Sequence, residues 1–169
     1  MSANRFTALI AVIAAERVLE LVVSQRNLRW SKAHGGKEFG AGHYPVMVAL
    51  HSGLLLGSVL EARRRRSRPA LGRLMFAVVL AAQGLRWWCI ATLGRQWNTR
   101  VVVVPGARRV VNGPYRVVPH PNYVAVVTEG AALPLAGGAW ITALVFSAAN
   151  AALLRTRVRV ENEALQGLT

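Results

Sequence analysis

The sequence predicts an all-α integral membrane protein of about five transmembrane helices, the last two forming a helical hairpin. Hydrophobic residues make up 53% of the chain, and the mean hydropathy is positive at +0.33. These residues fall into runs close to the roughly 20 residues that cross a bilayer. Most of the 21 Lys and Arg residues lie near the ends of those runs, where lipid headgroups would accept them.

A length of 169 residues predicts a single domain, residues 1–169. The net charge of +14 would suit nucleic acid, but no nucleic-acid-binding motif accompanies it, so membrane lipids are the expected partner. Cys89 is the sole cysteine and the chain has no Asp. Neither a disulfide framework nor a metal site is therefore expected.

The first three predicted spans are residues 6–23, 43–60 and 70–93, within the segment 1–93. Residues 24–42 are expected to extend the first helix and then form an interfacial loop. The arginine-rich residues 63–68 are expected to form a turn in the headgroup region. His51 lies inside the second span, where a lone histidine is more often a packing residue than a ligand.

The first and third spans carry charged residues that are costly in lipid. Glu16 and Glu20 lie one helical turn apart and share a face. They are expected to face the interior of the bundle and to pair with Arg17 or Arg86. Arg86 lies deep in the third span, which makes it a candidate for the functional site as well.

Residues 94–119 form the longest segment between spans, and residues 101–104 in it predict a short strand or a cover over a pocket. Two apolar stretches follow, at 121–135 and 138–154, separated by Pro134 and Gly137-Gly138. They predict either one kinked helix or, preferably, a hairpin within residues 120–169. In a hairpin the first arm is short, and Glu129 packs inside the bundle.

With five spans, seven Lys and Arg residues lie on the side that holds residues 63–68, and twelve lie on the other side. The more positive side is expected to face the cytoplasm. It contains the loop around His120 and the carboxyl-terminal segment. The arginine-rich turn on the opposite side argues against this orientation.

Residues 112–123 form a polar, proline-rich loop between the apolar runs. Proline fixes its own φ angle and moves the preceding residue out of the helical region, so Gly113-Pro114 and His120-Pro121 both bend the chain. Pro121 also suits the first turn of a helix. The loop is therefore expected to be rigid and to bring His120 and Tyr123 to the start of a helix.

Three motifs together resemble the isoprenylcysteine carboxyl methyltransferase family of integral membrane methyltransferases. They are Gly113-Pro114-Tyr115-Arg116, His120-Pro121-Asn122-Tyr123, and Arg157 with Glu161 four residues later. The likeness covers about residues 93–165. Residues 30–51 look like a bacterial branch of the family that is associated with O-methylation of alkylpyrones or alkylresorcinols.

The resemblance implies S-adenosylmethionine as cofactor, a cofactor loop at 94–119 and a site helix near the carboxyl terminus. Arg157 matches the acceptor-binding arginine and is also the expected catalytic residue, with Arg86. The family often has His in place of Ala107, and Arg in place of Pro119. The cofactor-binding residues that the resemblance implies are Ala107, Arg108, Arg109, Val110, Tyr115, His120, Pro121, Asn122, Tyr123 and Glu161.

Without the resemblance, Arg157 and Glu161 could be an ordinary salt bridge at a helix end. With it, the chain is expected to be an O-methyltransferase of the bacterial cytoplasmic membrane, with its cofactor site facing the cytoplasm. The acceptor would be a lipophilic small molecule or a lipidated group carrying a carboxylate or a phenolic hydroxyl. Alternatives are a phospholipid N-methyltransferase and a small membrane scaffold or lipid-binding protein; sterol reduction is disfavoured. The sequence makes no prediction of oligomeric state.

Overall fold

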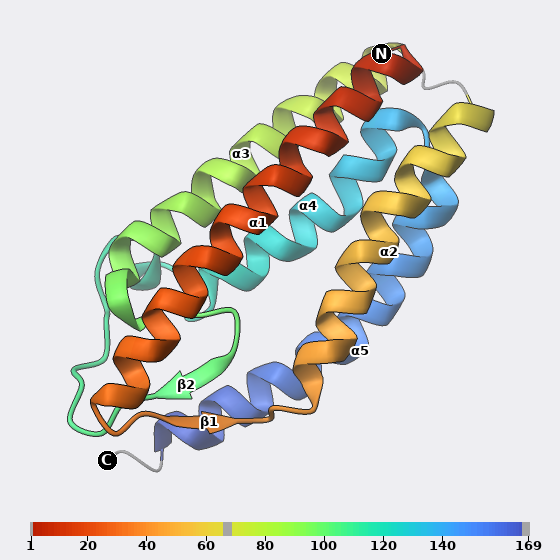
Figure 1. The fold of residues 1–169 in the computed structure, drawn as a ribbon. Helices are drawn as coiled ribbons and strands as arrows, with labels where there is room; N and C mark the ends of the chain where they lie inside the picture. The colour runs from red at the N-terminus through yellow and green to blue at the C-terminus, as the bar shows by residue number, and fades with distance from the viewer. Residues whose placement is uncertain (1, 66–68, 167–169) are drawn as a thin grey trace.

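A computed structural model describes residues 2–65 and 69–166 as a bundle of five α-helices with a small sheet at one end (Figure 1). Part of the predicted arginine-rich turn, residues 66–68, lies outside the described residues. The helices are α1 (Ala3–Ala33), α2 (His43–Arg64), α3 (Pro69–Leu93), α4 (Pro121–Gly137) and α5 (Trp140–Gln166). Two 3₁₀ helices, η1 (Gly94–Gln96) and η2 (Gly113–Arg116), lie between α3 and α4.

The five helices run along one long axis in alternating directions (Figure 1). The amino terminus lies at one end of the bundle, and the carboxyl terminus lies with the sheet at the other. Helix α4 packs between α3 and α5, and α2 packs on α5. The bundle therefore brings residues 34–42, 94–120 and the end of α5 to the same end of the molecule.

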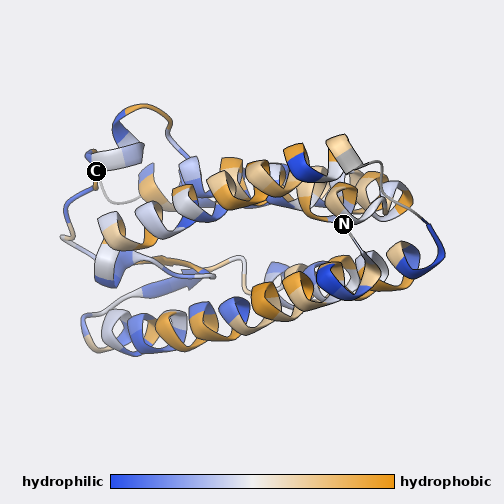
Figure 2. Cartoon of the chain, turned by 90° about the horizontal axis from the view of Figure 1, so that it is seen from above, coloured by the Kyte–Doolittle hydropathy of each residue, from blue (hydrophilic) through white to orange (hydrophobic). Residues whose placement is uncertain are grey.

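The all-α prediction with five helices is confirmed. Two of the helical segments, His43–Arg64 and Ala70–Gln96, are long and apolar enough to cross a membrane by length and composition. Figure 2 shows apolar residues along the middle of the helices and hydrophilic residues gathered towards the ends of the bundle. Large apolar side chains also point outward, among them Val12, Leu56, Leu80 and Val145.

The predicted hairpin is confirmed, and the alternative of one kinked helix is wrong. Helix α4 ends at Gly137 and is capped by Gly138, whose φ of 83° is left-handed and favours glycine. The Ala139 N–H donates to the Pro134 carbonyl at 2.8 Å and closes the turn. Gly130 has no room for a side chain because the Phe146 ring lies against it, so α4 and α5 approach closely.

A two-stranded antiparallel sheet joins β1 (Lys37–Phe39) to β2 (Val101–Val103), with Lys37 opposite Val103. The strand at 101–104 was predicted. The assignment of 24–42 to a helix extension and an interfacial loop was wrong in part, because three residues of it pair with β2. Val101 and Val103 pack with Ala164 of α5, and this tertiary contact has no local signal in the sequence.

The main apolar core lies towards the amino-terminal end of the bundle. It joins α1, α2, α3 and α4 around Phe6, Ile10, Val79 and Leu133. Phe6 sits against Gly137, where a Cβ atom would clash with its ring. The cavity described below lies towards the other end of the bundle, where the sheet is.

Candidate functional site

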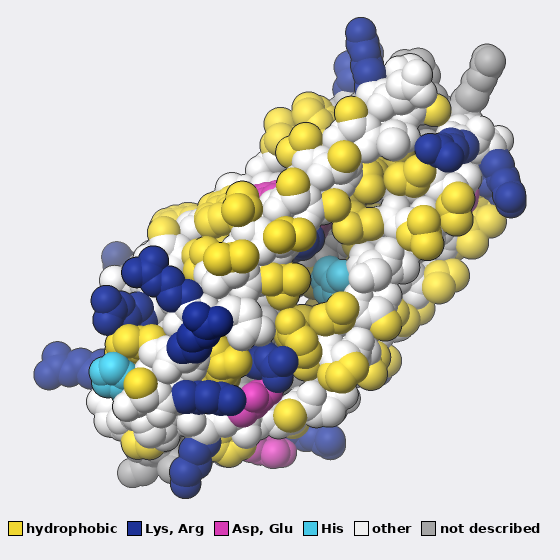
Figure 3. Space-filling model, in the orientation of Figure 1, with side chains coloured by type: hydrophobic (Ala, Val, Ile, Leu, Met, Phe, Trp, Pro, Cys, Tyr) yellow, Lys and Arg dark blue, Asp and Glu magenta, His cyan; other side chains and the backbone are white. Residues whose placement is uncertain are grey.

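A cavity of about 890 Å³ extends from the interior of the bundle to the loop between β2 and α4. All five helices, β2 and η2 contribute to its wall. Figure 3 shows a hollow midway along one face, where a histidine side chain lies among apolar ones, while most basic side chains on that face gather at the sheet end. The cavity therefore has an inner end among the helices and an outer end under the loop.

The loop folds as the prolines predict. Residues 113–116 form η2, and the next bend ends at His120, which directly precedes Pro121 at the start of α4. Gly113 has a φ of 55°, and a side chain there would clash with Thr92 of α3. The loop is thus held against α3, and its tyrosine and histidine face the cavity.

Ten of the predicted site residues line this cavity, and two do not. Arg108 is exposed and does not line the cavity, although its carbonyl accepts from the Gln96 side chain at 3.3 Å. Pro121 is buried at the helix start and sets its direction. The ten that line the cavity are Arg86, Ala107, Arg109, Val110, Tyr115, His120, Asn122, Tyr123, Arg157 and Glu161.

Glu161 is held at the outer end by two residues of the proline-rich motif. The Tyr123 hydroxyl donates to its carboxylate at 2.6 Å, and His120 Nδ1 lies 3.6 Å from the same oxygen. The rings of His120 and Tyr123 stack with centroids 5.5 Å apart. His120 Nε2 also lies 3.1 Å from the side-chain oxygen of Asn162. The motif and α5 therefore form one polar cluster.

Arg157 lies one turn before Glu161 on α5 but does not pair with it. Its side chain is only 6% exposed. Its guanidinium donates to the Thr99 carbonyl at 2.9 Å, lies 3.4 Å from the Met47 sulfur, and sits 6.0 Å from the centre of the Tyr123 ring. No carboxylate among residues 2–65 and 69–166 forms an ion pair with it. The pattern is not that of an exposed salt bridge.

Arg86 lies at the inner end, and its charge is compensated. It is 4% exposed and forms a hydrogen-bonded ion pair with Glu129 of α4. Its Nε lies 3.6 Å from a carboxylate oxygen of Glu20. Glu129 packs inside the bundle, as predicted. Arg86 reaches the cavity wall, but two carboxylates already hold its guanidinium.

Arg17 completes this inner group of charges, and the predicted pairing of the α1 charges is confirmed. It lies 2.7 Å from Glu20, 3.7 Å from Glu16 and 3.5 Å from Glu129. It also donates to Gln83 of α3 at 2.9 Å. Together these contacts tie α1, α3 and α4 to one another in the middle of the bundle.

Tyr115 of η2 lies against Cys89 of α3. Burial raises the pKa of the Tyr115 phenol well above its ordinary value, and the neighbouring Cys89 raises it further. The group therefore remains a hydroxyl at physiological pH, and it is hydrogen-bonded to Cys89.

Several cavity residues were not predicted to take part in a site. Met47 and Thr99 hold the Arg157 guanidinium through a sulfur and a backbone carbonyl, and neither contact has a sequence signature. His51, predicted to be a packing residue, packs edge-on against Phe146 and also lines the inner end of the cavity, together with Asn150 of α5. For Asn150, the one signal in the sequence is a polar residue within an apolar run.

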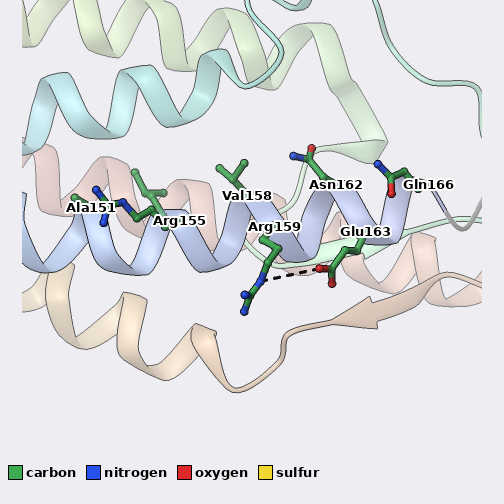
Figure 4. Close-up of a pocket in the computed structure, with 8 residues that line it drawn as sticks. Ala151, Arg155, Val158, Arg159, Asn162, Glu163 and Gln166 are labelled. Carbon is green, nitrogen blue, oxygen red and sulfur yellow. Dashed lines mark ion pairs between the residues drawn. The ribbon is translucent and has the colours of Figure 1, made fainter.

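A second hollow lies along one side of α5 and has a different character (Figure 4). Every residue that lines it belongs to this one helix, and none of the predicted site residues is among them. Arg159 and Glu163 form an exposed pair across it at 4.0 Å. Its residues are Ala151, Leu154, Arg155, Val158, Arg159, Asn162, Glu163 and Gln166. This is a surface groove of one helix rather than a site built from several elements.

The outer end of the main cavity fits the chemical groups of S-adenosylmethionine. The Glu161 carboxylate suits an ammonium or a ribose hydroxyl, and the Asn122 side-chain oxygen is buried without a partner among the described residues. The rings of Tyr123 and His120 offer flat apolar surfaces. A cavity of about 890 Å³ is within the size range of cofactor sites.

Comparison with known proteins places these residues in a family. The sequence profile of the isoprenylcysteine carboxyl methyltransferase (ICMT) family matches residues 74–167. The chain is also 38% identical over 162 residues to uncharacterized protein YpbQ of Bacillus subtilis (strain 168), an alignment that covers 95% of this chain and 96% of that protein. No solved structure matches the chain.

Proposed function

Because the chain belongs to the isoprenylcysteine carboxyl methyltransferase family, we propose that it is a membrane-embedded, S-adenosylmethionine-dependent O-methyltransferase. The cofactor binds at the outer end of the cavity, between the proline-rich loop and α5. The acceptor is a lipophilic molecule with an ionisable oxygen. Family membership implies methyl transfer; the site residues and the acceptor class are our proposals.

The observation that carries the proposal is the buried guanidinium of Arg157. It lines the cavity and has no carboxylate partner among the described residues. An isolated buried charge is costly unless a partner compensates it. A ligand with a carboxylate, enolate or phenolate oxygen would supply that partner, and a guanidinium can hold such an oxygen through two N–H groups.

The chain's own groups would then divide the work. Glu161, oriented by the Tyr123 hydroxyl at 2.6 Å, binds the cofactor's ammonium or ribose. Arg157 binds and orients the acceptor oxygen, and the sheet and loop exclude water from the cavity. When bound, S-adenosylmethionine supplies an activated methyl group. Since an ionised acceptor needs no strong base, orientation and water exclusion supply most of the acceleration. Arg86 stays a candidate catalytic residue because it lines the cavity.

The distribution of side chains supports entry of the acceptor from the bilayer. Leu21 of α1 and Val48 of α2 line the cavity and are 36% and 41% exposed. An opening rimmed by apolar side chains on the lipid-facing side of a bundle admits an alkyl tail without exposing it to water. Each helix also carries exposed apolar residues, such as Val22, Val127 and Leu144. We therefore propose that all five helices lie in the membrane.

The orientation follows from charge. Among the described residues, twelve Lys and Arg residues lie at or near the sheet end of the bundle, against five at the other end. By the positive-inside rule, the sheet end faces the cytoplasm, where S-adenosylmethionine is made available to the site.

The unpaired positive charge of Arg157 also bears on the alternative functions. Phospholipid N-methylation requires a neutral amine as nucleophile, which a guanidinium does not bind; only the phosphate of such a lipid would pair with Arg157. A membrane scaffold without a ligand would leave the Arg157 charge uncompensated. O-methylation is therefore the function that the cavity supports best.

A direct test uses purified membranes that contain the protein and S-adenosylmethionine with an isotopically labelled methyl group. The expected result is label in an organic extract, located by mass spectrometry on an oxygen of a lipophilic product. Label on a lipid nitrogen would support N-methylation instead, and absence of labelled product with every lipid extract tested would overturn the proposal.

A further inference from the structure

The loop between β2 and α4 carries apolar side chains that are largely uncovered. Val111 and Val117 are 65% and 81% exposed, and Val118 is 37% exposed. Single exposed valines are ordinary on a protein surface, but three within residues 111–118 of one polar loop call for a partner surface. All three also border the main cavity, so the same loop has one side towards the ligand site.

The same loop is basic. Residues 105–119 include Arg108, Arg109 and Arg116 but neither Asp nor Glu. All three arginines are exposed. No carboxylate in the described ranges 2–65 and 69–166 forms an ion pair with any of them. Basic and apolar side chains on one exposed segment are the combination that binds an anionic lipid surface.

The loop lies beside a helix that is long and apolar enough to cross a membrane. A Cβ atom on Gly113 would lie 2.7 Å from the Thr92 hydroxyl oxygen and 3.3 Å from the Trp88 indole nitrogen. Both residues belong to the candidate span Ala70–Gln96. Trp88 is 55% exposed, and exposed tryptophans towards the end of a span lie at the level of the headgroups. The loop packs against this tryptophan and therefore lies at the same level.

Anionic lipid satisfies both kinds of side chain on this surface. Lipid phosphates accept from guanidinium groups in two-point fashion, and the boundary of the acyl chains accepts valine side chains. A second copy of the chain is a poorer partner for the same surface. In a two-fold symmetric contact its loop would bring the same three positive charges against this one.

We propose that residues 108–118 dock on anionic lipid headgroups at the membrane surface. Arg108 and Arg116 bind lipid phosphates, while Val111 and Val117 enter the boundary between headgroups and acyl chains. Burial of the valines favours the contact with any bilayer, and the arginines make it specific for negatively charged lipid.

Docking acts on the ligand site through the loop itself. The loop also carries Tyr115, which is hydrogen-bonded to Cys89 and lines the cavity. It continues into His120, which stacks on Tyr123 beside Glu161. Fixing the loop on the membrane therefore fixes one wall of the outer end of the cavity. This second step rests on the proposed function and predicts that affinity for S-adenosylmethionine rises with the anionic lipid content.

The position of the loop is measured with a nitroxide label at Val117→Cys in lipid nanodiscs that contain phosphatidylglycerol. Cys89 is buried and is the sole cysteine, so unmodified protein should take up little label. Molecular oxygen concentrates in the bilayer, whereas a nickel chelate stays in water. We expect oxygen to relax the label at 117 more strongly, and the chelate more weakly, than at Glu163→Cys, an exposed position at the same end of the bundle.

Three results of this measurement would overturn the proposal. Equal accessibility at the two positions would place the loop in water. Shielding from both reagents, with spin–spin broadening between chains, would show that a second copy covers the valines. In nanodiscs of phosphatidylcholine alone the bilayer pattern should weaken, because the arginines lack anionic partners there. An unchanged pattern would show that apolar burial alone holds the loop, against the choice of anionic lipid.

Calorimetric titration with S-adenosylmethionine in the same two lipid compositions tests the second step. Wild-type protein should bind the cofactor about fivefold more tightly with phosphatidylglycerol, the effect expected of one basic residue beside an anionic surface. Arg116→Gln and Val117→Asn should each lose most of that gain. Arg64→Gln is the matched control and should keep it, because it removes one exposed arginine at the opposite end of the bundle. Equal gains in all four proteins would contradict the link between docking and the cofactor.

The two measurements separate docking from the proposed function. The label position needs no cofactor. Protein that binds no S-adenosylmethionine in any lipid would refute the proposed function, while a label in the bilayer would still support docking. A label in water on protein that binds the cofactor normally would refute docking alone.

Discussion

Two arginines of this protein are almost equally buried but have opposite surroundings. Arg86, 4% exposed, is paired with Glu129 and lies near Glu20. Arg157, 6% exposed, contacts a backbone carbonyl, a thioether and the side chain of Tyr123, and has no carboxylate partner among the described residues. The first charge is compensated within the protein, whereas we propose that a ligand compensates the second. Burial alone thus does not distinguish the two arginines; the absence of a counter-ion among the described residues does, and it is the ground on which we propose a functional role for Arg157.

The inner charges have a structural consequence. Their contacts cross between α1, α3 and α4, so they fix the relative positions of three helices in the part of the bundle where the apolar core ends. A buried ion pair contributes little net stability compared with well-packed apolar residues. Removing one partner is nevertheless costly, because the other charge then stays buried without compensation.

The largest effect should come from Glu129→Ala. This change removes a partner of Arg86 and of Arg17, and we expect it to destabilise the fold by about 3–5 kcal/mol. Unfolding in detergent, followed by circular dichroism, measures this. Glu163→Ala, at an exposed pair on α5, is the control and should change little. If Glu129→Ala kept its stability but lost turnover, the inner group of charges would have a catalytic role rather than a structural one.

Arg157→Ala should have the reverse profile. The fold loses no ion pair, so stability should stay within about 1 kcal/mol of the wild-type value. The barrier to transfer to the acceptor should rise by roughly 1.5–3 kcal/mol, so that kcat/KM falls about 10–150-fold. Arg157→Lys should restore little, because an ammonium cannot hold an oxygen in two-point fashion. Steady-state kinetics with a chosen acceptor measures both, with Arg155→Ala as the neighbouring exposed control. Full activity of Arg157→Ala would show that this arginine has a packing role and does not bind the acceptor.

Glu161→Ala should separate cofactor from acceptor at the outer end. It removes the carboxylate that Tyr123 and His120 hold. We expect affinity for S-adenosylmethionine to fall by about 1.5–3 kcal/mol, since a charge-assisted hydrogen bond is lost, while binding of an acceptor probe stays nearly unchanged. Calorimetric titration with each ligand gives both values. Equal losses for the two ligands would show that Glu161 and Arg157 do not divide the cavity as proposed.

Tyr123→Phe should have the smallest effect. It keeps the ring that stacks on His120 and removes only the hydroxyl that donates to Glu161 at 2.6 Å. Cofactor affinity should decrease by about 1 kcal/mol, the typical net value of one hydrogen bond. A loss as large as that of Glu161→Ala would mean that the hydroxyl itself contacts the cofactor.

The sequence predicted the parts of this structure that local chemistry controls. The prolines at 114 and 121 set the loop and the start of α4, Gly138 set the hairpin, and the one-turn spacing of Glu16 and Glu20 put them on one face. The pairing of β1 with β2, and the contacts of Arg157 with Met47 and Thr99, depend on residues more than 50 positions apart. No periodicity or local propensity records such contacts.

The candidate site divides in the same way. His120, Tyr123 and Glu161 were expected at one site because of the family resemblance, and the fold brings them within hydrogen-bonding or stacking distance. The sequence did not predict Asn150 as a cavity residue, because a single polar residue in an apolar run does not show what it faces. Whether the residues that line the cavity bind the cofactor stays a prediction.

The most direct test of the account is a calorimetric titration of the purified wild-type protein in detergent with S-adenosylmethionine. We expect saturable binding at one site per chain, competed by S-adenosylhomocysteine, which keeps the ammonium and ribose groups proposed to bind Glu161 and lacks only the methyl group and the sulfonium charge. No binding of either compound across a range of lipids and pH values would contradict it.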